Sequence, residues 1–475
     1  MAAGSNLVAT KFQCVGSDTS RTIPTTNDRT QHHPRMIPSI LPPVRTLSGC
    51  VAALLMSMHA LADCPPLQDY YPANDTQWPQ AEQQLGILMP ECLLSAEYFA
   101  LYGAALLNTG QIAPALEALE RALLLEPDNG SARVDYAQAL YLAGQLFPAL
   151  EVNSALLQRA DLPPSLTAML QERQQSWQSQ TRSRGLQVEV ATGYDNNLNG
   201  APSRSDFTLT LSGEQIALTL DPEFQPVSGP YLNLRLNGFY QRLTPERNHD
   251  LLFSLRNRIS EHRDSDLLQF DWRYGLTLPE AGYQWDLMAG TSHLLYGGSP
   301  LYTVTELRAR RRANGEGCRP QYEAAAQHQW YHGQELVAGV EASATAGLEC
   351  PLAGETQLVG IEVGPLMNLA VRDKRPGADR KGWKLRLSWQ WRLGTGLLSS
   401  QLNYARLNDE VGYSDLLAGG AKRQIESRVF RLQYTRPLQE NLVFLFNFTH
   451  QDQGSNIGPF ESRGTAADLG ISYNF

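Results

Sequence analysis

The chain has 475 residues, of which 42% are hydrophobic and 18% charged, and its formal net charge is -9. This length predicts at least two domains. The acidic balance, without any basic run that carries interleaved aromatic residues, argues against nucleic acid as a partner. Mean hydropathy is -0.32, and no apolar run approaches the ~20 residues of a membrane helix. A β-barrel would escape such a scan, because half of each strand is polar.

The front of the chain carries an export signal. Residues 1–35 are polar and without periodicity, and we interpret them as a disordered leader or an upstream extension from a misplaced start codon. Residues 36–62 predict a secretory signal peptide: Arg45 supplies the positive charge, 47–58 the apolar run, and Ala60-Leu-Ala62 the small-residue cleavage site. Cys50 and Cys64 lie in imperfect lipoboxes, so simple cleavage after Ala62 is expected rather than lipidation.

Four cysteines remain after cleavage, and their spacing predicts two local disulfides. The long gap in the middle separates Cys64 and Cys92 from Cys318 and Cys350. An even number of cysteines in an exported chain favours disulfides, and no CxxC or paired-His spacing favours a metal site instead. The later pair should face each other across one hairpin of strands.

Residues 63–182 predict a periplasmic α-helical domain. Gly110-Gln-Ile-Ala-Pro-Ala-Leu-Glu117 recurs as Gly144-Gln-Leu-Phe-Pro-Ala-Leu-Glu151, 34 positions later, which is the tetratricopeptide repeat (TPR) length. In the second copy Asn153 stands where Leu is expected. Such repeats present a concave groove, lined here by Asn108, Gln138 and Tyr141, that would bind a partner. The alternative is a domain that merely acts as a spacer or a plug.

Residues 183–475 predict fourteen antiparallel strands of a transmembrane β-barrel. Trp383 to Leu393 alternates apolar and polar residues without a break, and 268–276 and 442–448 repeat the scheme. Tight turns follow some strands and long polar loops follow the others, as in outer-membrane barrels, whereas a sandwich has no reason to sort loops this way. The fold class is therefore TPR-like helices followed by a 14-stranded barrel. The last strand, 464–475, should close the barrel on 186–196.

The strand pattern assigns several cations to a wet lumen: Arg235, Arg273, Lys384, Arg386, Arg392 and Arg431. No catalytic motif, cofactor fingerprint or metal-spaced cluster accompanies them. We therefore expect a protein that is not an enzyme, has no cofactor, and acts by its shape. The segment 207–227, between the first two barrel strands, is long enough to contain its own strands and to plug the bore.

The asparagine-rich run Gly193-Tyr-Asp-Asn-Asn-Leu-Asn-Gly-Ala-Pro202, the degenerate repeats and Leu162-Pro-Pro164 together resemble the surface lipoprotein assembly modulators (Slam). That resemblance implies an outer-membrane translocon with its helices in the periplasm. It implies a client lipoprotein or secreted scavenger protein as partner. Outer-membrane lipid and the barrel assembly machinery would be further partners. The alternatives are an exopolysaccharide export porin, which also joins repeats to a barrel, and a structural outer-membrane protein without a transport role.

Overall fold

The structure is a computed structural model that describes residues 64–352 and 356–475. The expected leader and signal peptide lie outside the described residues. The chain divides into two compact units, one ending at Asn129 and one running from Gly130 to Phe475. Each unit is described by itself.

The first unit is a helical hairpin preceded by one further helix. It contains α1 (Trp78–Leu88), α2 (Ala96–Asn108) and α3 (Ile112–Leu125), with short 3-10 turns at Leu67–Tyr70, Asp75–Gln77 and Met89–Glu91. Ser95 caps α2 by accepting a hydrogen bond from the Tyr98 amide at 3.1 Å. Gly103 lets α2 and α3 approach closely, because a Cβ there would lie 2.6 Å from Cγ of Leu119. The small residue at this crossing therefore sets the packing of the hairpin.

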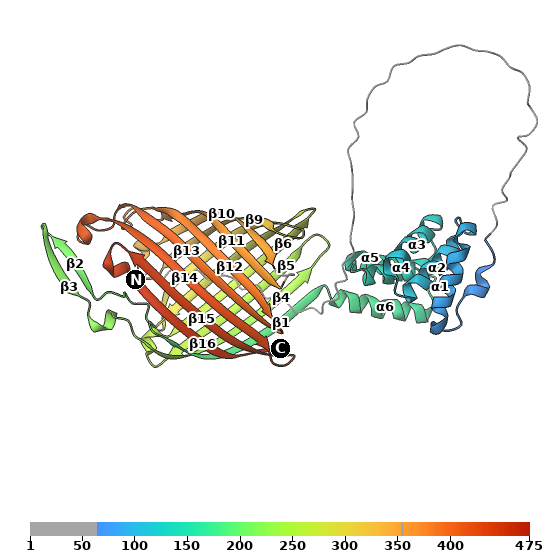
Figure 1. Cartoon of the computed structure of the whole chain (residues 1–475), viewed down its shortest axis with the longest axis horizontal. Helices are drawn as coiled ribbons and strands as arrows, with labels where there is room; N and C mark the ends of the chain where they lie inside the picture. The colour runs from blue at the N-terminus through green and yellow to red at the C-terminus, as the bar shows by residue number, and fades with distance from the viewer. Residues whose placement is uncertain (1–63, 353–355) are drawn as a thin grey trace, which may run out of the picture. The chain divides into compact units, whose positions relative to one another are not determined.

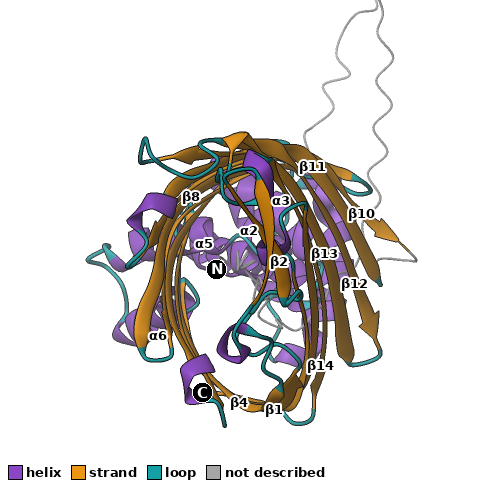
Figure 2. Cartoon of the chain, turned by 90° about the vertical axis from the view of Figure 1, so that its left-hand side faces the viewer, coloured by secondary structure: helices purple, strands orange, loops and turns teal. Residues whose placement is uncertain are grey.

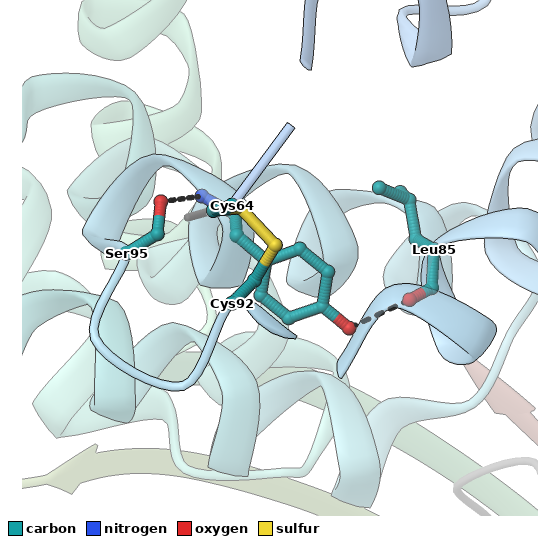
Figure 3. The surroundings of a disulfide bond; sticks show 5 residues. Cys64, Leu85, Cys92 and Ser95 are labelled. Carbon is teal, nitrogen blue, oxygen red and sulfur yellow. Dashed lines mark hydrogen bonds between the residues drawn. A yellow bond between two sulfur atoms is a disulfide. The ribbon is translucent and has the colours of Figure 1, made fainter. Parts of the chain in front are cut away.

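A disulfide ties the start of this unit to the loop before α2. Cys64 and Cys92 are bonded, as the sequence predicts, and Figure 3 shows this bond. The Tyr98 hydroxyl donates to the Leu85 carbonyl at 2.7 Å. Cys92 and Tyr98 are both buried. The hydrogen bond joins α2 to α1, and the disulfide holds the start of the unit against the loop between these helices.

Replacing Cys64 and Cys92 together by Ala should lower the stability of the first unit. The disulfide closes a loop with a sequence separation of 28 residues. In the chain-entropy model, this lowers the entropy of the unfolded chain and raises the free energy of unfolding by about 3 to 4 kcal/mol. The check is thermal melting of the full-length protein in detergent, followed by circular dichroism at 222 nm. Equal melting of the helical signal in the variant and in the natural protein would contradict the prediction.

The second unit begins with three more helices, α4 (Gly130–Leu142), α5 (Leu146–Leu157) and α6 (Pro164–Ser179). The α4–α5 hairpin starts 34 residues after the α2–α3 hairpin, and Gly110 and Gly144 occupy equivalent turns with φ of 81° and 78°. The side chain of Asn153 is fully buried and donates to the Leu170 carbonyl and to Gln174 Oε1. These bonds to α6 explain why a polar residue replaces the expected Leu.

Fourteen strands form a closed antiparallel barrel, and Figures 1 and 2 show it from the side and along its length. The barrel strands are β1 (Arg182–Asp195), β4 (Gly229–Leu243), β5 (Asn248–Ser260), β6 (Leu267–Glu280), β7 (Tyr283–Tyr296), β8 (Ser299–Ala313), β9 (Arg319–Tyr331), β10 (Gly339–Leu352), β11 (Gln357–Ala370), β12 (Arg380–Leu393), β13 (Gly396–Gly412), β14 (Lys422–Pro437), β15 (Leu442–Ser455) and β16 (Ser462–Asn474). Every strand pairs with its sequence neighbours in the barrel, and β16 closes on β1. The strand number and the closing pair agree with the prediction.

Side chains alternate between the two faces of the wall. In β6, Leu268, Phe270 and Trp272 are exposed on the outer face, whereas Gln269 and Asp271 are buried on the inner face. An apolar outer face and a polar inner face are the arrangement of outer-membrane barrels, the reverse of a soluble sandwich. The strands have 13 to 17 residues, longer than the ~9–11 that cross a bilayer. Each strand therefore continues beyond the apolar belt. Among the described residues, no helix is long and apolar enough to cross a membrane.

The segment between β1 and β4 forms a separate hairpin of β2 (Asp206–Leu211) and β3 (Glu214–Thr219). Figure 1 shows this hairpin projecting beyond one rim of the barrel rather than entering the bore. The Thr210 amide donates to the Leu416 carbonyl at 2.8 Å, which attaches β2 to the loop between β13 and β14. The plug that the length of this segment allowed is not formed.

The second disulfide lies at the opposite rim. Cys318 and Cys350 are bonded, with their Cα atoms 4.0 Å apart, next to the paired residues Arg319 and Glu349. They lie across the β9–β10 hairpin, where the sequence placed them. The short turns β4–β5, β6–β7, β12–β13 and β14–β15 share this rim with the start of β1.

Candidate functional site: the lumen wall and the closing seam

A band of paired charges crosses the inner wall over six neighbouring strands, β7 to β12. Its centre is Glu323 of β9, whose side chain is 3% exposed. Glu323 pairs with Arg310 of β8 and lies 3.9 Å from Nε of Arg308 and 4.0 Å from Nζ of Lys384. One carboxylate therefore serves three cations. Among the described residues, none of these groups lies in a cluster that could hold a metal ion.

The band continues on both sides of Glu323. Glu362 of β11 pairs with Arg386 at 3.1 Å and accepts a hydrogen bond from Gln321 at 3.1 Å. At the other end, Arg312 of β8 pairs with Asp286 of β7 at 3.2 Å. Charges removed from water need partners of this kind, because an unpaired buried charge is strongly destabilising. The band therefore forms a polar wall whose cations are neutralised within the sheet.

The six predicted lumen cations lie on the inward face of their strands. Arg235 pairs with Glu189 of β1 at 3.1 Å, and Lys384 donates to Ser343 Oγ at 2.8 Å. The sequence identified these cations but missed their acidic partners Glu323, Glu362 and Glu189. Strand alternation alone places those three acids inward, so the signal was present; the pairing itself depends on the inter-strand register.

A polar latch spans the seam between β1 and β16. The Tyr231 hydroxyl of β4 donates to Asp468 Oδ2 of β16 at 2.8 Å, and the other oxygen of Asp468 accepts from Asn447 Nδ2 of β15 at 2.7 Å. Tyr231 reaches across β1 because Gly193, which faces both residues in the register, has no side chain. A Cβ at Gly193 would lie 2.6 Å from Cβ of Asp468. These two hydrogen bonds thus tie β4, β16 and β15 together across β1.

The asparagine-rich run holds the same seam at the rim near the β2–β3 hairpin. Asn196 exchanges two hydrogen bonds with the Thr465 backbone of β16, through its own amide at 3.1 Å and its side-chain oxygen at 2.7 Å. Asn197 donates to the Arg463 and Ala201 carbonyls, both at 2.9 Å. Asp195 pairs with Arg258 of β5 at 3.0 Å. The asparagine-rich run Gly193–Pro202 therefore joins the first and last strands by hydrogen bonds.

The regular pairing of this seam is shorter than that of any other ladder in the barrel. It runs from Gln187 with Asn474 to Asp195 with Ala466, and single backbone bonds extend it at each end. On the other side of β1, the ladder with β4 begins at Arg182. The seam therefore depends more than other ladders on the side-chain bonds of the latch and of the asparagine run.

Loops fold onto the rim near the β2–β3 hairpin. Asp409, whose side chain is 1% exposed, pairs with Arg423 at 3.2 Å, and the Arg423 guanidinium lies over the rings of Tyr413 and Phe460. Gly377, with φ of 78°, approaches so closely that a Cβ would overlap the Asp409 carboxylate. This cluster fixes the loops of β11–β12, β13–β14 and β15–β16 to one another.

The three predicted groove residues have different surroundings. Asn108 is exposed at the end of α2, where its side chain bonds to the Ala104 carbonyl. Gln138 is half-buried on α4. The Tyr141 ring stacks on Trp177 of α6 at 4.7 Å, and its hydroxyl accepts from Gln180 at 2.8 Å. Tyr141 therefore packs against α6, the helix that follows the second hairpin.

Asp135 on α4 is a half-buried carboxyl group near Arg173 of α6. Burial raises the pKa of Asp135 from 3.8 to about 6, and the charge of Arg173 offsets part of that rise. Burial also lowers the pKa of Arg173, whose guanidinium donates to the Val134 carbonyl and lies over the Trp177 ring. The α4–α6 contact thus contains a carboxyl group that folding makes harder to ionise.

The stability of α4–α6 should therefore rise as pH falls. A carboxyl group whose folded pKa is about 6 and whose unfolded pKa is near 3.8 binds its proton more tightly in the folded state, so folding gains stability between those values, by at most about 1.4 kcal/mol per pH unit. Asp135→Asn should flatten this dependence in 222 nm melts of the full-length protein at pH 7, 6 and 5. Asp161→Asn, at an exposed Asp paired with Arg159, is the control; equal slopes in both variants would contradict the prediction.

No family model matches the chain, and no curated protein matches it. Solved structures do match. The anion-selective porin from Comamonas acidovorans is 10% identical over 62% of this chain and 99% of its own, with a TM-score of 0.32. OmpT, an outer-membrane protein of Vibrio cholerae, is 6% identical over 62% of this chain and 98% of its own, with a TM-score of 0.35. The Yersinia enterocolitica type III secretion chaperone SycD, solved with a peptide of the translocator YopD, is 14% identical over 22% of this chain and 82% of its own, with a TM-score of 0.21. These values are too low to transfer a function.

Proposed function

We propose that this protein is an outer-membrane translocon that assists the export of surface lipoproteins or related secreted proteins, with its helical domain in the periplasm. The observation that carries the proposal is the position of Gly193–Pro202. This run resembles the Slam family in sequence, and its residues fasten the seam at which β16 closes on β1. Because side chains of this run hold the short β1–β16 ladder together, we infer that the barrel opens between these two strands.

The chemistry of a lipidated client favours an exit through the seam. Each CH₂ group of an acyl chain loses about 0.8 kcal/mol when it leaves an apolar environment. The inner wall carries the charged band around Glu323 and Glu362, so an acyl chain in the bore would meet charge and water. The outer face is apolar, so a seam that opens sideways lets the lipid remain in the membrane while the polypeptide uses the polar bore.

The helical hairpins support a delivered substrate. A diffusion porin needs no second domain, whereas repeated helical hairpins bury one face against their neighbours and present another to a partner. The helices lead directly into β1 at Arg182, at the rim of short turns, which is the periplasmic rim in outer-membrane barrels. This connection supports the proposal that the helical domain meets its client in the periplasm.

The test is surface display of a candidate client in cells that lack this protein. Lipoproteins encoded beside the gene are co-expressed with it or without it, and protease access at the surface of intact cells is scored. Export is expected only with the protein present, and the client should otherwise remain in the periplasm. Normal display of every candidate without the protein would refute the proposal. Loss of a surface polysaccharide with unchanged lipoprotein display would favour the sugar-export alternative.

A further inference from the structure

An apolar groove crosses the outer face of the barrel at the short-turn end of the seam. Its volume is about 710 Å³. It is lined by residues of β1, β4, β5 and β6 and by Phe475, which follows β16; Arg184, Leu186, Gly238, Phe253 and Trp272 are among them.

The groove exists because an outward position lacks a side chain. Gly238 of β4 lies between Leu186 of β1 and Phe253 of β5 in the register. A Cβ at Gly238 would meet nothing closer than Leu186 Cδ1 at 3.8 Å and Phe253 Cδ1 at 3.9 Å. The floor of the groove is therefore open, and rings such as that of Trp272 stand along its sides. Its volume and apolar lining suit a hydrocarbon chain.

Three arginines lie on the same outward face at the rim end of the groove. Arg182 of β1 and Arg242 of β4 are directly opposite each other, and Arg184 is opposite Tyr240. All three side chains are exposed, and within the described part of the chain none forms an ion pair. Like charges directly opposite on neighbouring strands are destabilising, so this arrangement calls for an anion.

The acidic side chains around the arginines leave that requirement unmet. His249 of β5, opposite Arg242, is hydrogen-bonded to the Tyr274 hydroxyl. Glu246, in the turn between β4 and β5, pairs with Arg247 at 3.3 Å. Asp250 accepts a hydrogen bond from Gln241 on the inner face. The nearby acids are thus engaged with other groups or lie on the other side of the wall.

We propose that this groove binds an anionic phospholipid of the periplasmic leaflet, with an acyl chain over Gly238 and the phosphate group at Arg184, Arg182 and Arg242. The placement rests on the proposed orientation, with the short-turn rim toward the periplasm. Cationic residues just outside the apolar belt attract anionic headgroups in this way. Because Phe475 and Leu186 bond to each other through their backbones at 2.8 Å and both line the groove, the lipid touches both edges of the seam.

The test uses the full-length protein in detergent, with native mass spectrometry as the measurement and phosphatidylglycerol and phosphatidylethanolamine as the probes. The natural protein should retain phosphatidylglycerol in preference to phosphatidylethanolamine. The double variant Arg184→Ala/Arg242→Ala should weaken retention of phosphatidylglycerol by about tenfold. Gly238→Leu, which the open floor accepts without a backbone clash, should reduce retention of both lipids.

Arg436→Ala is the matched control, because Arg436 of β14 is also exposed near the short-turn rim but lies outside the groove. It should leave retention unchanged. Equal retention of the two lipids by the natural protein, or equal losses in Arg436→Ala and the double variant, would overturn the proposal. Lipid retention requires no client, so a negative result here and a negative result in the export assay are separate outcomes.

Discussion

Joining Thr192 to Leu469 by a disulfide should stop client export, and reduction should restore it. The two residues are register partners across the seam, Leu469 is 55% exposed on the outer face, and both substitutions to Cys leave the inner latch untouched. If the client leaves sideways, a covalent bond between β1 and β16 blocks its path. The barrel itself should remain folded, because the bond only reinforces an existing ladder.

The measurement is surface display of the client before and after treatment with a reductant, with cross-link formation confirmed by gel mobility. The control is Leu432→Cys/Phe448→Cys, a register pair of β14 and β15 on the same outer face. That pair should cross-link without effect on export. Undiminished export by the fully cross-linked seam variant would show that the client does not pass between β1 and β16.

The barrel was predictable because strand alternation and turn position are local properties of the sequence. The count of fourteen, the closure of 464–475 on the first strand and the bonding of Cys318 to Cys350 all followed from those two properties. The TPR assignment stays a prediction, supported by the 34-residue spacing of the two hairpins.

The contacts between distant residues were not predictable. Alternation places Tyr231 and Asp468 on the inner face, but only the register around Gly193 brings them within 2.8 Å. The contact of Tyr141 with α6 was not predictable for the same reason, because the packing of α6 involves Asn153 and Trp177 and does not follow from the repeat spacing. The contacts that build the candidate site therefore depend on how strands and helices pair, and a single sequence does not reveal that pairing.

Replacing Glu323 by Gln should destabilise the barrel and make its lumen more selective for anions. Glu323 is the shared partner of Arg308, Arg310 and Lys384. Removing one partner from a buried charge cluster typically costs about 3 to 5 kcal/mol, because the remaining charges lose their compensation. In gel electrophoresis, the folded form of the variant should disappear at a lower temperature than that of the natural protein. In planar bilayers, the reversal potential should shift toward that of chloride.

Glu335→Gln provides the matched control, because Glu335 pairs with Arg372 at the surface, where both side chains are about half exposed. A surface pair contributes at most about 1 kcal/mol. The unfolding temperature on the gel and the reversal potential should therefore stay near those of the natural protein. Adding Arg310→Gln to Glu323→Gln removes one cation together with its carboxylate and should recover part of the lost stability and selectivity. If the single and double variants behave alike, the Arg310–Glu323 pair does not set the charge of the lumen. Recovery of stability and selectivity in the double variant would show that the acids of the charge band neutralise its arginines. This neutralisation keeps the polar bore from binding every anion that enters it.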